Sequence, residues 1–215
     1  LTVSRTPLDD AALARAAPAV RALLSDALVR EGLALLAPAP EVTRQLARLR
    51  FAAGAGFPGL PDLSDPALAG VLLDGAGVVR SLDSLDLGRL IEGLLAGIDR
   101  RRLDARFPAW LETPAGSRHA IDYGAQGGPA VEVRVQALFG LATHPRAGET
   151  PLVLHLASPA GRVMAVTRDL PGFWRTGWKE VQREMKGRYP KHPWPDDPAA
   201  STATLRSKAA DARRA

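Results

Sequence analysis

The sequence predicts an α+β fold: a helical N-terminal segment, then a small domain of two β-hairpins with two helices, then a disordered tail. Three observations lead to this prediction. Apolar residues recur at helical spacing through the first half of the chain. Turn-rich tetrapeptides between apolar runs indicate hairpins in the second half. After Asp196, Leu205 is the only large apolar residue, which is too little to offset the entropy cost of ordering. We therefore expect regions at 1–106, 107–195 and 196–215.

Four helices are expected in the first region, because apolar side chains recur there at spacings of three and four. Each is marked by residues suited to a helix terminus. A Gly- and Pro-rich loop is expected at 54–61, and a short basic turn at 99–106. The terminal residues are Pro18 and Gly32 for the first helix, Pro40 for the second, Ser64 or Asp65 before Pro66 for the third, and Asp86 for the fourth.

Two β-hairpins are expected after Phe107, where apolar runs flank short turn-forming segments. The first joins 110–113 to 118–123, and the second joins 152–157 to 162–167. A final helix is expected from Pro171 to Gly187.

The segment 131–141 fits either a strand or a helix. Val131, Val133 and Val135 alternate as in a strand, but the apolar residues that follow also fit helical spacing. We expect a helix, because Pro129 can open it and Gly140 can end it.

No catalytic or metal site is predicted. The G-x-G-x-x-G run at 54–59 lacks the preceding strand that a dinucleotide site needs, and no P-loop sequence occurs. The four histidines have no metal-ligand spacing. Asp122 and Asp169 each end a predicted strand and could meet as an acid–base pair, but turn and cap roles are favoured.

The composition narrows the class of protein. There is no cysteine, no apolar run long enough to span a bilayer, and no signal-peptide pattern, so we expect a cytoplasmic protein with no membrane partner. The chain begins with Leu1 rather than Met, which leads us to expect a fragment. Residues 170–215 hold ten Lys or Arg against five Asp or Glu, a net of +5 that equals the charge of the whole chain. Such a basic end favours a nucleic-acid partner over the alternative of a merely solvated surface.

Candidate nucleic-acid-binding residues lie on and after the last helix. Trp174, Trp178, Val181 and Met185 form an apolar stripe expected in the core, with a basic stripe beside it. Beyond Gly187, cations alternate with aromatic residues in a proline-stiffened strip, which suits base stacking and phosphate binding. Trp194 could instead fill a groove in its own domain. The candidates are Arg175, Lys179, Arg183, Lys186, Arg188, Tyr189, Lys191, His192 and Trp194.

The same stretch carries a family resemblance. Residues 167–174 (TRDLPGFW) and 180–195 (EVQREMKGRYPKHPWP) resemble the C-terminal end of bacterial HrpB-type helicases. That family has a V-T-x-D-L-x-x-F-W run before a G-R-Y-P-(K/R)-H-x-W-P run. Residues 114–118 are similar to its P-S-G-S run, with Ala115 in place of Ser, and 138–140 and 154–161 also match. The match is strong from Phe107 to Pro195 and weaker over the helical half.

The resemblance implies a longer parent protein, an ATP-dependent RNA helicase of the DExH-box, superfamily 2 class. In this family, ATP and Mg²⁺ bind to two motor domains, which a helical region and the C-terminal domain follow. It implies no cofactor and no catalytic residue in these 215 residues, because the motor motifs do not occur in them. The expected partners are single-stranded RNA or DNA and the motor domains of the same chain. The alternative is a protein-interaction or intramolecular docking module that regulates the motor.

Overall fold

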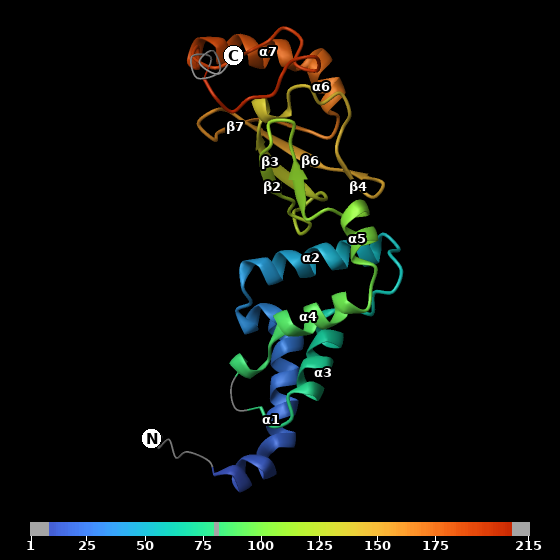
Figure 1. Ribbon diagram of the computed structural model, residues 1–215. Coiled ribbons are helices and arrows are strands. Elements are labelled where there is room, and N and C mark those ends of the chain that lie inside the picture. The colour runs from blue at the N-terminus through green and yellow to red at the C-terminus, as the bar shows by residue number, and fades with distance from the viewer. Residues whose placement is uncertain (1–8, 80–81, 208–215) are drawn as a thin grey trace, which may run out of the picture. The chain divides into compact units, whose positions relative to one another are not determined.

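The computed structural model describes residues 9–79 and 82–207, and the chain divides into two units, Leu1–Arg100 and Arg101–Ala215. In the first unit, α1 packs along α3 and α2 packs along α4 (Figure 1). Leu28, Leu49, Leu73 and Ile91 are fully buried between these helices. The helices are α1 (Asp10–Glu31), α2 (Pro40–Gly54), α3 (Asp65–Gly75) and α4 (Leu87–Ala96), with 3-10 turns at Leu33–Leu36 and Leu82–Ser84.

The predicted helix termini of this unit are largely confirmed. Gly32 follows α1 with a φ of 77°, a backbone conformation that glycine adopts without steric cost. Pro40 lies in the first turn of α2. The Ser64 hydroxyl accepts from the Ala67 amide at the start of α3, and the Asp86 carboxylate accepts from the Arg89 amide at the start of α4. The prediction of four helices in this region is therefore confirmed.

Two details of the helical prediction were wrong. Helix α1 begins at Asp10, so Pro18 lies inside it and not at its start. The Asp9 carboxylate caps the helix by accepting from the Ala12 amide at 2.6 Å. Pro18 lacks an amide hydrogen, so it leaves one hydrogen bond of the helix interior unmade. The expected basic turn at 99–106 is the short helix α5 (Arg100–Arg106), which Leu103 anchors by burying its side chain.

The second unit contains a three-stranded sheet in the order β3-β6-β7. Strand β3 (Ala130–Arg134) is parallel to β6 (Val153–Ala157), and β6 is antiparallel to β7 (Val163–Thr167). Two smaller hairpins accompany it. They are β1 (Trp110–Glu112) with β2 (Arg118–Ala120), and β4 (Arg146–Ala147) with β5 (Thr150–Pro151). Both predicted hairpins are thus confirmed, and the β4–β5 pair is an addition.

The helix expected at 131–141 was wrong, because the segment forms β3 and then a 3-10 turn, Val135–Leu138. Val131 and Val133 are buried while Glu132 and Arg134 are exposed, the alternation of a strand. The deciding contact is with β6, where Val131 lies opposite Leu154. A parallel ladder to a strand so much later in the chain outweighs the local helix signals.

The single helix expected from Pro171 to Gly187 was also wrong in detail, since it is two helices, α6 (Leu170–Thr176) and α7 (Trp178–Arg188). Gly177 separates them. A Cβ atom built on Gly177 would lie 2.8 Å from Cδ2 of Phe173, so the chain passes this ring only because glycine lacks a side chain. Figure 1 shows α6 and α7 beside each other at one end of the sheet.

A disordered tail was expected from Asp196 onward. Residues 196–207 form no helix or strand. Its start is nevertheless held against the domain, because the Gly140 amide donates to the Pro198 carbonyl at 2.9 Å and Pro198 is buried. The remainder of the predicted tail, 208–215, lies outside the described residues.

Candidate nucleic-acid interface

An aromatic cluster fixes α6 and α7 on the second unit. Trp178 is fully buried, and its ring lies 5.5 Å from the rings of Phe139 and Trp174 in edge-on geometry. Its indole N–H donates to the Pro195 carbonyl at 2.9 Å. The sequence prediction that Trp174 and Trp178 belong to the core is confirmed. The cluster holds the cations of α7 on a rigid support.

Trp194 belongs to this same cluster, which decides between its two alternatives. Its side chain is only 4% exposed, its ring lies 6.0 Å from that of Trp178, and its indole N–H donates to the Tyr189 carbonyl at 2.9 Å. The Gln182 amide group holds the same segment by donating to the Trp194 and Pro195 carbonyls. The prediction that Trp194 stacks on a base is therefore wrong, because its buried ring is not accessible to a nucleic-acid strand.

The predicted cations remain at the surface. Arg175, Lys179, Arg183, Lys186, Arg188 and Lys191 are all exposed. Two of them form ion pairs, Lys186 with Asp196 at 3.6 Å and Arg188 with Glu184 at 3.3 Å. The Gln182 amide and the Lys186 ammonium together lower the pKa of the Asp196 carboxyl. The other four have no ion pair among the described residues.

These cations do not form one patch. Successive residues of an α-helix are rotated by about 100°, so Lys179, Arg183 and Lys186 share one side of α7. Arg188 lies roughly opposite Lys179 on the same helix. We call Lys179, Arg183 and Lys186 the α7 stripe. The sequence prediction placed Arg175 on the same stripe and Arg188 in an extended strip beyond the helix. In the structure Arg175 lies on α6, and Arg188 is the last residue of α7.

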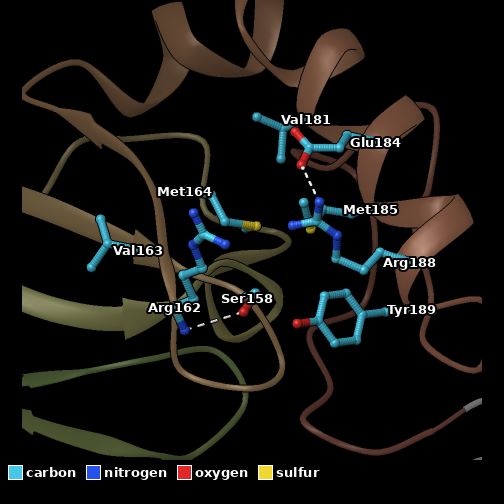
Figure 2. Close-up of a pocket in the computed structure, with 9 residues that line it drawn as sticks. All are labelled: Ser158, Arg162, Val163, Met164, Val181, Glu184, Met185, Arg188 and Tyr189. Atoms are coloured by element: carbon cyan, nitrogen blue, oxygen red, sulfur yellow. Dashed lines mark hydrogen bonds and ion pairs between the residues drawn. The ribbon is translucent and has the colours of Figure 1, made fainter.

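Arg188 and Tyr189 line a pocket between the end of α7 and the β6–β7 turn, with a volume of about 250 Å³ (Figure 2). We call it the α7–β7 pocket. Figure 2 shows the Tyr189 ring at its side, with the hydroxyl group directed toward Ser158. Polar and apolar side chains share the walls: Ser158, Arg162, Val163, Met164, Val181, Glu184, Met185, Arg188 and Tyr189.

The β6–β7 turn places Arg162 at this pocket. The Arg162 amide donates to the Ser158 hydroxyl at 3.2 Å, the Ser158 amide donates to the Arg162 carbonyl at 2.8 Å, and Gly161 adopts a φ of 84°. The Arg162 guanidinium has no ion pair among the described residues. Ser158 and Arg162 were not predicted as site residues, because the sequence of 158–161 indicates only a hairpin turn. The position of Arg162 directly after this turn was the signal that could have indicated a site residue.

His192, the last candidate, is half-buried. Its amide donates to the Tyr189 carbonyl at 3.1 Å, so it helps to close the turn after α7. Its ring Nδ1 is buried and accepts no hydrogen bond from a described residue. The backbone contact therefore gives His192 a part in positioning Tyr189.

Asp122 and Asp169, the candidate acid–base pair, have the turn and cap roles that the sequence favoured. The Asp122 carboxylate accepts from the Gly124 amide in a turn, and the Asp169 carboxylate caps α6 by accepting from the Gly172 amide. Each bond is local and leaves the two carboxylates in separate turns. Among the described residues, no cluster of three His, Asp or Glu could hold a metal ion.

A serine–histidine contact in the first hairpin is also structural. The Ser117 hydroxyl lies 3.0 Å from His119 Nε2, a distance compatible with nucleophile activation. However, Thr113 Oγ1 lies 2.8 Å from the same hydroxyl and accepts from the Ser117 amide, so the three side chains close the β1–β2 turn. In the described part of the chain, no carboxylate orients His119.

The G-x-G-x-x-G loop at 54–59 does not resemble a dinucleotide site. It follows helix α2, and the residues after it are irregular up to Ser64. A dinucleotide fingerprint would follow a strand and open a helix. Within the described ranges, no helix has the length and apolar character needed to cross a bilayer.

Comparison with known proteins places these observations in a family. Residues 69–198 match the family described as "ATP-dependent helicase C-terminal". The ATP-dependent RNA helicase HrpB of Escherichia coli (strain K12) is 49% identical over 138 residues, which is 63% of this chain and 17% of that protein.

Two solved structures are also similar. A crystal structure of the E. coli DExH-box NTPase HrpB matches 94% of this chain and 26% of its own, with a TM-score of 0.73 and 38% identity. A crystal structure of the Escherichia coli DEAH/RHA helicase HrpB matches 90% of this chain and 25% of its own, with a TM-score of 0.61 and 36% identity. The chain thus spans about a quarter or less of the length of these relatives.

Proposed function

The chain belongs to the ATP-dependent helicase C-terminal family, and on that premise we propose that its second unit binds and guides a nucleic-acid strand beside the motor of a longer helicase. The relatives named above are helicases or NTPases. In this proposal, ATP and Mg²⁺ bind to motor domains outside these 215 residues. The protein works in the cytoplasm, and its partners are single-stranded RNA or DNA and its own motor.

The observation that carries the proposal is the α7 stripe. Lys179, Arg183 and Lys186 are exposed on one side of a helix whose opposite contacts are fixed by the aromatic cluster. Lys179 and Arg183 have no ion pair among the described residues, so their charges are free to bind phosphates. Exposed cations at helical spacing attract a polyanion, and of the three only Lys186 has an ion pair, with Asp196, for which a phosphate would compete.

A second function, docking of a protein segment, is favoured by a different surface. A hollow of about 460 Å³ in the first unit lies between α3 and α4, and Val71 on its wall is 53% exposed. The exposed Val71 side chain in a concave surface is the observation that favours docking of a protein segment. This function would regulate the motor through contacts between protein segments and needs no nucleic acid on α7.

The two functions differ in how salt concentration affects binding, because only strand binding depends on contacts with phosphates. Each cation that contacts a phosphate contributes about −0.7 to the slope of log affinity against log salt for a single strand. The double variant Lys179→Ala/Arg183→Ala should therefore bind single-stranded RNA more weakly, with a slope smaller by about 1.4. The matched control is Arg15→Ala/Arg44→Ala, which removes two exposed cations from the first unit.

Fluorescence anisotropy with labelled RNA and DNA over a range of salt measures both quantities. Equal slopes for the wild type and the α7 variant would refute strand binding at the stripe. If Val71→Asp instead changed the ATPase rate of the full-length protein and left RNA affinity unchanged, the docking function would be supported.

A further inference from the structure

We propose that the α7–β7 pocket receives one unpaired base of the bound strand and prefers bases that carry an amino group. This inference rests on the proposed function, because it needs a single strand nearby. It concerns a different side of α7 from the stripe, so the two can fail separately.

The size of the pocket suits a single base. Its volume is about 250 Å³, slightly below the roughly 300–1,000 Å³ of sites for drug-sized ligands. Met164, Met185 and Val181 supply apolar wall, and Met185 is only 3% exposed. Flexible thioethers adapt to flat rings of different outline. A base is flat and mostly apolar on its faces, with polar groups on its edge, and the pocket shows the same division.

Tyr189 supplies the stacking surface and is held in advance. Its carbonyl accepts from the Trp194 indole at 2.9 Å and from the His192 amide at 3.1 Å. Its own amide donates to the Met185 carbonyl at 2.7 Å. These three bonds fix the backbone of Tyr189 before any ligand arrives, which lowers the entropy cost of stacking. Buried Trp194 thus acts on the strand through Tyr189.

Glu184 and Arg188 give the pocket its polar edge. Their side chains pair at 3.3 Å, and the pair is directed into the pocket in Figure 2. A carboxylate accepts hydrogen bonds from amino groups such as N4 of cytosine, whereas uracil and thymine present a carbonyl at that position. Because Arg188 balances the charge of Glu184, this edge of the pocket has no net charge and suits the hydrogen-bonding edge of a base. The unpaired guanidinium of Arg162 at the rim is available for the phosphate of the same nucleotide.

The first test compares Tyr189→Leu with Tyr189→Phe. Loss of one base–aromatic stack should weaken binding of oligo(C) roughly tenfold, at the lower part of the usual range. Phenylalanine keeps the ring and should bind within about twofold of the wild type. Far-ultraviolet circular dichroism and the unfolding midpoint report whether each variant is folded. If Tyr189→Leu unfolds the domain, quenching of 2-aminopurine in the strand by the wild type and by Tyr189→Phe still tests the stack.

The second test concerns base preference. The wild type should bind oligo(C) roughly tenfold more tightly than oligo(U), and oligo(dC) more tightly than oligo(dT). Glu184→Gln should abolish this preference, because an amide can donate to uracil as well as accept from cytosine. The RNA and DNA arms show which strand the site takes.

The outcomes separate the two proposals. If the stripe variant Lys179→Ala/Arg183→Ala loses affinity while Tyr189→Leu binds like the wild type, the base pocket is refuted and strand binding stands. Equal binding of oligo(C) and oligo(U) by the wild type overturns the amino-group preference. If the wild type binds no strand at low salt, both proposals fail.

Discussion

Replacement of Trp178 by alanine should destabilise the second unit by about 4 kcal/mol. The side chain is fully buried, and an indole buries roughly 200 Å² of surface, which corresponds to about 5 kcal/mol at ~25 cal/mol per Å². The alanine methyl group retains part of this area, and large-to-small changes of Trp cost about 3–5 kcal/mol. The lost bond to the Pro195 carbonyl adds about 1 kcal/mol at most, because Gln182 still donates to that oxygen at 2.7 Å.

Urea unfolding followed by far-ultraviolet circular dichroism measures this loss. With a slope of about 1.5 kcal/mol per molar urea, the midpoint of the second unit should fall by roughly 2–3 M. Trp110→Ala is the matched control, because Trp110 is 42% exposed and contacts Arg118 across one ring face. It should cost less than about 1 kcal/mol. A loss below about 1 kcal/mol for Trp178→Ala, or equal losses for both variants, would refute the aromatic cluster as the support of α7.

Two further changes test the second unit. His144 Nδ1 accepts from the Leu170 amide at 3.0 Å, and burial lowers the pKa of the imidazole below its ordinary 6.5. The folded state thus favours the neutral ring, so its contribution to stability is complete above pH 6.5 and is lost as the pH falls through the folded pKa. The difference in unfolding free energy between the wild type and His144→Phe should therefore decrease as the pH is lowered through this range. A difference that stays constant with pH in urea titrations would contradict this account. Gly148→Ala should cost about 2 kcal/mol or more in thermal unfolding, because the residue has a φ of 57° and a Cβ atom would lie 2.9 Å from the buried Phe107 ring. Gly116→Ala, with a φ of 77° and open space around it, should pay only the backbone cost of about 1 kcal/mol, and equal midpoints would argue against the Phe107 contact.

Local chemistry was sufficient where one residue decides one terminus. Ser64 and Asp86 were predicted as caps, and each accepts the expected backbone hydrogen bond. The hairpin at Ser158–Gly161 was predicted from its turn residues, and Gly161 has the positive φ that such a turn uses. These features depend on atoms within a few residues of each other, which a sequence displays directly.

Distant contacts account for what the sequence did not reveal. The strand β3 depends on β6, and neither Pro129 nor Gly140 reports that partner. The break at Gly177 depends on the ring of Phe173 passing close to the backbone. Among the candidate site residues, exposure of the cations was predictable from their charge. The division between the helix cations and those beyond Gly187 was also predicted. The pocket that Arg188 lines with the β6–β7 turn was not, because it depends on contacts between segments that are distant in the sequence.

The parallel pairing of β3 with β6 has a consequence for the order of folding. Strands β6 and β7 are neighbours in the chain and can pair by closing a five-residue turn, Ser158–Arg162. Strand β3 reaches β6 only after the chain from Val135 to Leu152 has folded back, which requires closing a longer loop. Residues far apart in sequence pair more slowly than neighbours. We therefore expect the β6–β7 hairpin to form early and β3 to pair with it afterwards. The pairing of β3 should then limit the folding rate of the second unit.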